Sequence, residues 1–370
     1  MAANIFAQAL DFFGSVAILR HVIPGEAWKL LWYAIGQNRR VLYNGRLLQQ
    51  AAATWMPDSI KDALLIYNPT SGRRRHRRFA EIEQAVRLLK DSGIATELAP
   101  TTGRNTAKTI ARLAVEQRRG MVIACGGDGT INEIVNGLAG SHVPMAVLPA
   151  GTANILAKEL EIPWDIPHAS RLIPDGVVRR IALGVAVPLN GQHSDELPRE
   201  GRYFLSVAGA GPDGAIVNAV HGGLKKTAGI VAYWAEGMRQ LIRYDFPEMR
   251  VRSAGEERRA TIVVVGRTVN YGGPFKITTG ANLFEDSFEL LTNNARSRFR
   301  YIACLPALWL GKLRTMEGIE AWKATEAICE PDGAGPVFAQ VDGEPIGSLP
   351  LAFRIVPDAL SLVTPAQGKK

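Results

Sequence analysis

The chain has 370 residues, of which 47% are hydrophobic, and its 43 Lys and Arg against 35 Asp and Glu give a formal net charge of +8. This length and composition exclude a disordered, collagen-like or disulfide-scaffold protein and predict two or three domains with real cores. The three cysteines form no CxxC pair and indicate reduced thiols in a cytoplasmic protein, while the basic excess favours an anionic partner such as nucleotide, nucleic acid or a membrane surface.

Residues 1–60 form an aromatic-rich extension that differs from the rest of the chain. Helices are predicted at 5–19 and 26–35. The apolar stretch around the first helix still holds Asp11 and Arg20, so we expect neither a membrane-spanning segment nor a signal peptide. The extension either lies in a membrane interface or packs as a helical hairpin on the main domain or on a partner chain, which leaves a homodimer open.

Residues 61–185 alternate between short apolar runs and helical patterns. The helical patterns lie between predicted strands at 63–67, 95–99, 121–125 and 143–149. This βαβα repetition predicts a parallel sheet with helices on its faces.

Three polar, glycine-bearing turns follow strands of this region, at residues 68–72, 126–130 and 148–154. Glycine lets a backbone approach a ligand closely, and the N–H groups and hydroxyls of such turns suit a phosphate. Because the carboxyl ends of parallel strands share one edge, we expect the turns to converge in a ligand site rather than to be merely tight turns. Asp128 adds a carboxylate suited to Mg²⁺, water or a ribose hydroxyl.

Strands dominate the sequence after residue 180. The predicted strands are 181–189, 203–208, 261–265, 288–292 and 337–341, with one helix at 228–242 between them. We therefore expect a mostly antiparallel β lobe over residues 186–345, and a C-terminal segment, residues 346–370, that returns to the first lobe.

Two other patterns in the sequence are typical of binding sites. The arginine-rich run 73–78 suits nucleic acid, a solvated helix start, or a positive field for polyphosphate or an anionic membrane. No nucleic-acid-binding module surrounds it, so nucleic acid is not expected. Residues 209–214 spell GxGxxG but contain Pro212, and they are not expected to bind a dinucleotide.

The motifs Asn68-Pro-Thr-Ser-Gly72, Gly126-Gly-Asp-Gly-Thr-Ile-Asn-Glu133 and Leu148-Pro-Ala-Gly-Thr-Ala-Asn154, in this order, resemble the diacylglycerol-kinase catalytic-domain family. This family includes bacterial diacylglycerol and other lipid kinases, sphingosine kinases and ceramide kinases, and the resemblance covers about residues 61–365. It implies an α/β fold, with an NAD-kinase-like α/β nucleotide-binding lobe, a mostly antiparallel β-sandwich lobe and the lipid site between them. The helical extension lies outside the resemblance.

The resemblance also implies roles for single residues. Glu344 of the Asp-Gly-Glu element would accept the proton of the lipid hydroxyl, with Asp342 beside it and Asp128 toward Mg²⁺. Without the family, that element would be a hairpin turn. Thr101 matches the family spacing, with Thr102 as a close competitor. The residues implied to surround ATP are Asn68, Pro69, Thr70, Ser71, Gly72, Thr101, Gly127, Asp128, Gly129, Thr130, Ile131, Asn132, Glu133 and Thr152.

Two further assignments come from the resemblance alone. Relatives often bind a structural Mg²⁺ at an Asp-Asp-Gly loop, through the second Asp and two backbone carbonyls. The corresponding residues here are Asp286 with the carbonyls of Leu283 and Phe288, and Ser287 replaces the glycine. Asp213 resembles an acidic position near the lipid head group.

We therefore predict an ATP- and Mg²⁺-dependent lipid kinase, peripheral at the inner face of the membrane. It would transfer the γ-phosphoryl group to the hydroxyl of diacylglycerol, ceramide or a sphingoid base. One alternative is another small-molecule kinase of the NAD-kinase-like group. A second is a non-catalytic, membrane-associated nucleotide sensor.

Overall fold

The computed structural model describes residues 54–55, 60–72, 75–189, 201–221, 239, 244–272, 275–310, 312–333 and 335–366. The chain divides into two compact units, Met1–Ala53 and Thr54–Lys370, and only the second is described below. The helices predicted within residues 1–60, and the helix predicted at 228–242 apart from residue 239, lie outside the described residues.

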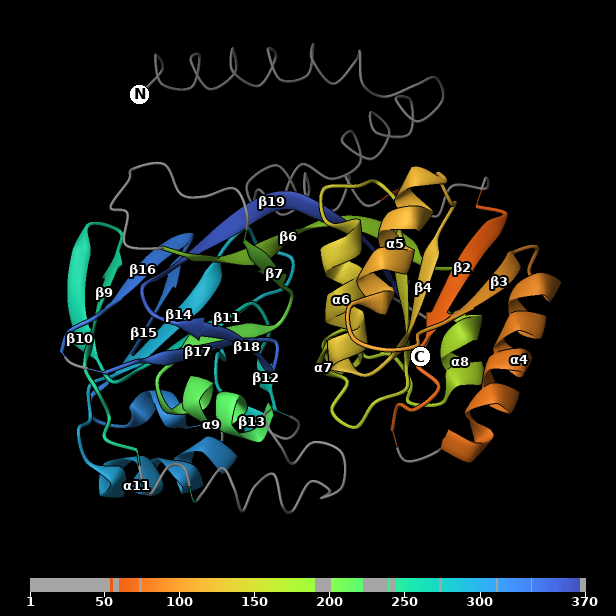
Figure 1. Cartoon of the computed structure of the whole chain (residues 1–370). Helices are drawn as coiled ribbons and strands as arrows, with labels where there is room; N and C mark the ends of the chain where they lie inside the picture. The colour runs from red at the N-terminus through yellow and green to blue at the C-terminus, as the bar shows by residue number, and fades with distance from the viewer. Residues whose placement is uncertain are drawn as a thin grey trace, which may run out of the picture. The chain divides into compact units, whose positions relative to one another are not determined.

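The first lobe is built on a parallel sheet (Figure 1). Its strands lie in the order β5-β4-β2-β3, and every neighbouring pair is parallel. All residues of β4 and β5 are buried, which explains their continuous apolar sequences. The strands are β2 (Asp62–Tyr67), β3 (Ala95–Pro100), β4 (Val122–Gly126) and β5 (Met145–Pro149).

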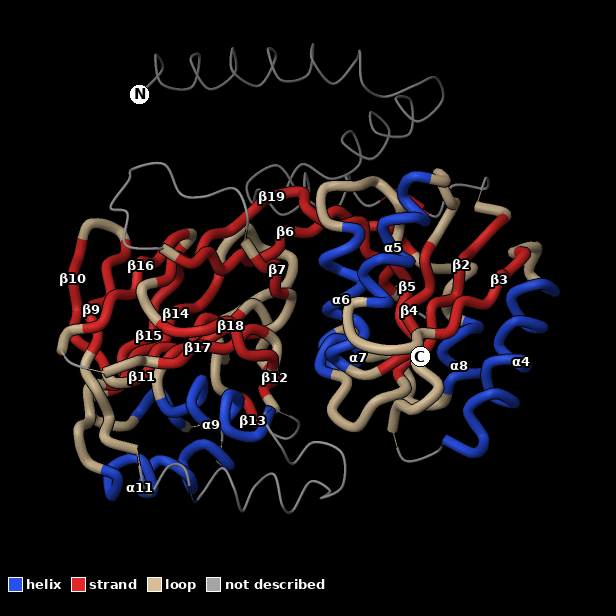
Figure 2. The backbone as a smooth tube through the Cα atoms, in the orientation of Figure 1, coloured by secondary structure: helices blue, strands red, loops and turns tan. Residues whose placement is uncertain are grey.

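Helices cover both faces of this sheet (Figure 2). On one face α4 packs with α8, and on the other α5 packs with α6. Ile82 and Leu89 of α4 and Ile134 and Leu138 of α6 are 0% exposed and join one core with the sheet. The helices are α4 (Arg75–Asp91), α5 (Thr106–Glu116), α6 (Asp128–Leu138), α7 (Ile155–Glu159) and α8 (Ile166–Arg171).

Two long strands, β6 (Val177–Pro188) and β19 (Leu351–Thr364), run from one lobe to the other (Figure 1). They pair with each other in antiparallel fashion. In the first lobe β19 is parallel to β5, with Leu362 opposite Met145, whereas its other end pairs with β16 of the second lobe. The short β1 (Thr54–Trp55) and β7 (Arg202–Phe204) also pair with β6.

The second lobe is a sandwich of antiparallel sheets. One sheet has the order β15-β14-β11-β8-β17-β18, and it packs on the part of the large sheet ordered β10-β9-β16-β19. Buried side chains from both sheets form its core, among them Met249, Val263 and Phe353. The strands are β8 (Val207–Ala210), β9 (Met249–Ser253), β10 (Glu256–Ala260), β11 (Ile262–Gly266), β14 (Phe288–Asn293), β15 (Ile319–Ala324), β16 (Glu326–Pro331), β17 (Phe338–Val341) and β18 (Glu344–Ser348).

Smaller elements complete this lobe. A two-stranded sheet and the helices α9 and α11 lie beside the six-stranded sheet (Figure 2). Their bounds are β12 (Asn270–Tyr271), β13 (Phe275–Lys276), α9 (Pro212–His221), α11 (Arg298–Trp309) and the 3₁₀ helix η2 (Leu313–Thr315). The predicted fold class, a parallel α/β lobe with an antiparallel sandwich, is confirmed. The single strand predicted at 203–208 is wrong, because the chain breaks there into β7 and β8.

Candidate active site

The glycine turns after β2, β4 and β5 meet at one edge of the parallel sheet, as the sequence predicts. A Cβ on Gly151 would lie 2.5 Å from the Cα of Gly127. A Cβ on Gly72, whose φ is +68°, would lie 2.4 Å from the carbonyl oxygen of Ala150. Only glycine permits this approach, so the three turns form one continuous stretch of closely packed backbone.

The first turn is stabilised by its own side chains. The Oδ1 of Asn68 accepts hydrogen bonds from the backbone N–H and the hydroxyl of Thr70, at 2.9 Å each. Its Nδ2 lies 3.5 Å from the Oγ1 of Thr130 on α6. Pro69 and Thr70 are exposed, so this turn presents backbone and a hydroxyl to solvent.

Arg78 links the first turn to the third. Its Nη2 donates to the carbonyls of Ser71 at 3.4 Å and Ala150 at 3.0 Å, and its Nη1 pairs with Glu81 at 3.2 Å. The side chain is buried. Arg78 is thus not part of a solvated positive patch, and the interpretation of residues 73–78 as one basic surface is wrong at this position.

Asp128 orders the third turn. Its two carboxylate oxygens accept hydrogen bonds from the backbone N–H groups of Asn154 at 3.0 Å and Ile155 at 2.6 Å, at the start of α7. Burial raises the pKa of this carboxyl, and the hydrogen bonds from Ile155 and Asn154 oppose that rise. The hydroxyl-bearing Thr152 is exposed in the same turn.

A buried carboxylate joins the two lobes. Oδ2 of Asp342 accepts from the Nδ2 of Asn132 on α6 at 2.7 Å and from the N–H of Leu205 at 2.9 Å. Its Oδ1 accepts from the N–H groups of Ser206 at 3.0 Å and Val207 at 2.9 Å, where β7 gives way to β8. Burial raises the pKa of this carboxyl, and the four hydrogen bonds oppose the rise.

Glu344 follows in the same turn and reaches the glycine turns. Its Oε1 lies 3.7 Å from the position that a Cβ on Gly129 would take, and its Oε2 lies 3.7 Å from Nη2 of Arg104. Its side chain is a quarter exposed. The turn itself is held by Gln340, whose Oε1 accepts from the N–H of Gly343 at 2.8 Å.

Glu133 and Thr101 support the loop that carries Arg104. Oε2 of Glu133 accepts from the N–H of Ala107 at 3.1 Å, in the first turn of α5, and thereby caps that helix. The N–H of Thr101 donates to the carbonyl of Tyr67 at 2.8 Å. The side chain of Ile131, a residue predicted to surround ATP, packs in the hydrophobic core.

Asp213 lies in the sandwich lobe and is connected to the same turn. Its Oδ1 accepts from the hydroxyl of Tyr271, and its Oδ2 accepts from Nε2 of Gln340 at 2.7 Å. Burial raises the pKa of Asp213, against the effect of these two hydrogen bonds. Gln340 therefore bonds both Asp213 and the turn that holds Glu344. The nearby GxGxxG pattern serves packing, since a Cβ on Gly214 would lie 2.1 Å from the carbonyl oxygen of Phe338.

The predicted structural Mg²⁺ ligands do not fit a metal ion. The carbonyl of Leu283 accepts a hydrogen bond of 2.7 Å from Nη2 of Arg267. Asp286 is exposed, and Phe288 begins β14. The positive guanidinium, whose pKa burial lowers to about 10, already occupies the space into which the loop carbonyls point.

Sequence reasoning missed Arg104, Gln340 and Tyr271. Each contacts a predicted site carboxylate, yet none belongs to a motif. Gln340 could have been noticed as the one polar residue of an otherwise apolar strand, two positions before Asp342. The other two come from loops or short strands whose positions depend on the tertiary fold.

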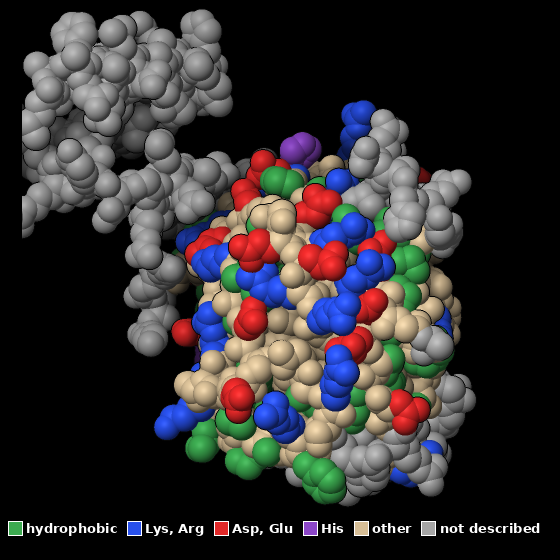
Figure 3. Space-filling model, turned by 90° about the vertical axis from the view of Figure 1, so that its left-hand side faces the viewer, with side chains coloured by type: hydrophobic (Ala, Val, Ile, Leu, Met, Phe, Trp, Pro, Cys, Tyr) green, Lys and Arg blue, Asp and Glu red, His purple; other side chains and the backbone are tan. Residues whose placement is uncertain are grey.

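The sandwich lobe carries acidic and basic side chains interleaved over β9 and β10 (Figure 3). Arg250 and Arg252 approach Glu330 to 4.0 and 2.9 Å, and Arg259 lies 3.3 Å from Asp332. This alternation differs from the single-sign field that binds nucleic acid. Within the residues that the structure describes, no helix has the length and apolarity needed to cross a membrane.

Family comparisons agree with this architecture. The diacylglycerol kinase catalytic domain model matches residues 62–186, and the YegS C-terminal NAD kinase beta sandwich-like domain model matches residues 206–364. The two matches correspond to the two lobes.

Individual diacylglycerol kinases are similar to this chain in sequence or in fold. The diacylglycerol kinase of Bacillus subtilis (strain 168) is 33% identical over 237 residues, which cover 63% of this chain and 73% of that protein. The diacylglycerol kinase of Staphylococcus saprophyticus is 28% identical over 235 residues, 62% of this chain and 72% of that protein. A crystal structure of a diacylglycerol kinase from Bacillus anthracis str. Sterne has the same fold, with a TM-score of 0.60 at 19% identity over 83% of this chain and 98% of that one.

The fold is a parallel α/β lobe joined to an NAD-kinase-like β sandwich. The chain belongs to the diacylglycerol kinase family. It is a lipid kinase, a phosphotransferase with an alcohol as acceptor, and this membership selects the lipid kinase over the two alternative functions.

Proposed function

We propose that this lipid kinase transfers the γ-phosphoryl group of ATP to the hydroxyl of a membrane lipid of the diacylglycerol class. The observation that carries the proposal is the position of Glu344, 3.7 Å from where a Cβ on Gly129 would lie. A carboxylate of the sandwich lobe thus stands over the glycine turn at the start of α6. The names of the relatives support diacylglycerol as the acceptor.

The glycine turns would hold the phosphates of ATP. The second of these turns leads into α6, an eleven-residue helix whose first backbone N–H groups and dipole favour an anion. Their packing excludes side chains between Gly127 and Gly151, which leaves backbone for a phosphate to contact. Arg104, exposed beside Glu344, adds positive charge there.

The donor set suits the Mg²⁺ that accompanies a nucleotide. Mg²⁺ is held in kinases by one or two carboxylates together with phosphate oxygens and water. Asp128 would supply such a carboxylate, because each of its oxygens accepts only one backbone N–H and keeps a lone pair. When bound, Mg²⁺ would neutralise charge on the phosphates.

Glu344 would act as the general base. It takes the proton of the lipid hydroxyl as that oxygen bonds to the γ-phosphorus, while the bond from the γ-phosphorus to the bridging oxygen breaks and ADP leaves. Asp342 is unsuited to this role, because four N–H donors occupy its oxygens. It is a positioning residue for the turn that carries Glu344. Asp213 would lie toward the lipid head group.

The proposal is tested with γ-labelled ATP and a panel of lipids in mixed micelles. We expect label in phosphatidic acid, formed from diacylglycerol, and a requirement for Mg²⁺. Label in the phosphate ester of ceramide or of a sphingoid base would show that this lipid, and not diacylglycerol, is the acceptor. Label in a water-soluble acceptor, with none in any lipid, would overturn the proposal.

Gly151→Ala tests the phosphate site. The new Cβ would lie 2.5 Å from the Gly127 Cα, so the two turns must move apart, and such overpacking costs about 1–3 kcal/mol. We expect the KM for ATP to rise by roughly tenfold, with a smaller change in the KM for lipid. Gly103→Ala is the control, because its Cβ would meet only Thr106, at 3.9 Å. Equal effects of the two substitutions would contradict this assignment.

We further propose that the protein works at the cytoplasmic membrane surface, where its lipid acceptor resides. The aromatic-rich residues 1–60 would make that contact, and all of them except residues 54, 55 and 60 lie outside the described residues. Membrane contact and a homodimer both stay predictions.

A further inference from the structure

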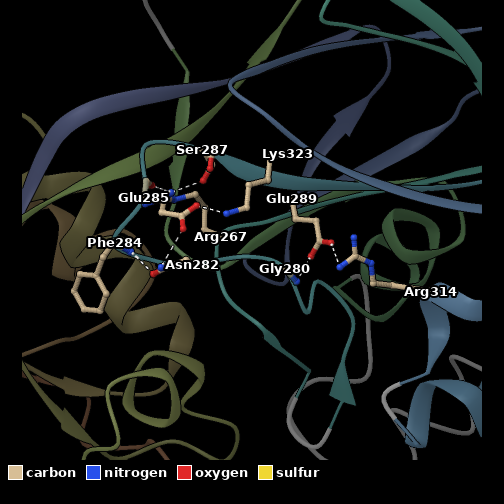
Figure 4. A network of polar contacts seen from close by, with 9 residues as sticks. All are labelled: Arg267, Gly280, Asn282, Phe284, Glu285, Ser287, Glu289, Arg314 and Lys323. Carbon is tan, nitrogen blue, oxygen red and sulfur yellow. Dashed lines mark hydrogen bonds and ion pairs between the residues drawn. The ribbon is translucent and has the colours of Figure 1, made fainter. Parts of the chain in front are cut away.

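A buried arginine side chain lies where several backbone carbonyls converge (Figure 4). Arg267 directly follows β11 and is 0% exposed. Its Nη1 donates to the carbonyls of Glu285 at 2.5 Å and Ser287 at 2.6 Å, and its Nη2 to those of Leu283 at 2.7 Å and Ala182 at 2.8 Å. The four terminal N–H bonds of the guanidinium match four acceptors.

Three of these acceptors come from alternate residues of one loop, 283, 285 and 287, which leads into β14. Carbonyl oxygens that converge in a buried space lose their water and repel one another, so a cation or N–H donors must lie among them. The fourth acceptor, Ala182, belongs to β6, the strand shared by the two lobes. One guanidinium thus both shapes the loop and ties it to the strand that joins the lobes.

The surrounding charges suit a fixed cation. Asp286 is exposed at the outer side of the loop, and its negative charge acts on Arg267, as does that of Glu285. Glu285 also pairs with Lys323 of β15 and accepts from Asn282 at 3.3 Å (Figure 4). The negative charges of Asp286 and Glu285 therefore act on the positive charge of Arg267, and Glu285 also pairs with Lys323.

We propose that Arg267 is the permanent cation of the 281–288 loop, occupying the place that a structural divalent metal ion would need, so that the loop is organised without Mg²⁺. A Mg²⁺ ion demands oxygen ligands at about 2.0–2.1 Å in octahedral geometry. A metal ion on the carbonyl of Leu283 would have to share that oxygen with the guanidinium of Arg267, and the two positive charges would repel each other at close range. Among the described residues, no three His, Cys, Asp or Glu side chains cluster closely enough to hold a metal. This inference goes beyond the proposed kinase activity.

The full-length protein is tested without nucleotide, so that Mg²⁺ bound with ATP does not interfere. We expect no stoichiometric divalent metal after purification, and a Tm that moves by less than about 1 °C between EDTA and millimolar Mg²⁺ or Mn²⁺. A tightly held equivalent of metal, whose removal by EDTA lowers the Tm, would overturn the proposal.

Arg267→Met removes the cation and leaves four carbonyls without donors, and it should lower the Tm by roughly 5 °C or more. Arg259→Met is the matched control, because Arg259 is 65% exposed and pairs with Asp332, and it should change the Tm by less than about 1 °C. Similar Tm values for the two variants would contradict the role of Arg267.

Asp286→Asn gives a second readout if Arg267→Met does not fold. A metal-held loop would lose Mn²⁺ binding and stability with this change. A loop held by Arg267 should keep its Tm within about 2 °C and show no Mn²⁺ binding before or after the substitution. Mn²⁺ binding by the wild type that Asp286→Asn abolishes would refute the proposal. None of these readouts uses kinase activity, so they test the role of Arg267 independently of the proposed function.

Discussion

Glu344→Gln is expected to lower kcat for lipid phosphorylation by roughly 10²–10⁴-fold, because the amide cannot accept the proton of the acceptor hydroxyl. Gln has nearly the same shape, and the side chain is a quarter exposed, so the Tm should stay within about 1 °C of the wild type. Labelled phosphatidic acid, measured at saturating ATP and lipid, reports kcat. The KM for ATP should change by less than about threefold, since the phosphates would be held mainly by backbone.

Glu326→Gln is the matched control for this change. Glu326 begins β16, is 47% exposed and lies 3.5 Å from Arg354, so it too loses one charge beside an arginine. It should retain wild-type activity. A Glu344→Gln enzyme with more than about half of the wild-type kcat would remove Glu344 from the role of base. If Glu344→Gln lowers the Tm strongly as well as the activity, Glu344 has a structural role instead.

The strands of the first lobe were predictable because their signal is local. Buried parallel strands read as continuous apolar runs, and β2, β4 and β5 lie within two residues of their predicted bounds. The sequence failed on β19, where Pro357 and Asp358 interrupt the apolar pattern. Both residues lie where the pairing register of β19 with β6 shifts, between Val356 and Leu360, and the pairing continues on either side. Such pairing depends on a strand far away in the sequence.

In the site, too, local features were predictable and contacts between distant residues were not. The convergence of the three glycine turns followed from the edge that the carboxyl ends of parallel strands share, and it is confirmed by the contact of Gly151 with Gly127. The roles of buried arginines did not follow, since Arg78 bonds a residue 72 positions away and Arg267 one 85 positions away. No local pattern distinguishes such a residue from an exposed arginine. The resemblance named Glu344 as the base, but no local pattern indicated that Asp342, in the same turn, bonds backbone N–H groups of residues 205–207.

Asp342→Asn is expected to lower the Tm by roughly 5 °C or more, corresponding to about 3 kcal/mol. The carboxylate accepts four N–H hydrogen bonds, whereas an amide offers one oxygen and would turn an NH₂ group toward two of these donors. Either orientation leaves buried N–H groups of residues 205–207 or of Asn132 without an acceptor. Thermal unfolding of the purified variant measures the effect.

Asp358→Asn is the control that distinguishes the loss of the Asp342 hydrogen bonds from an effect of the substitution on backbone conformation. Asp342 and Asp358 both have positive φ, 47° and 49°, a conformation that Asn adopts readily. Asp358 is exposed, so its substitution should change the Tm by less than about 1 °C. Because Asp342 connects α6 with the turn that holds Glu344, its loss should also lower kcat, whereas the KM for ATP should change less. Equal Tm values for the two variants would show that the four hydrogen bonds do not hold the lobes together, and Glu344 would then owe its position to Gln340 and Arg104.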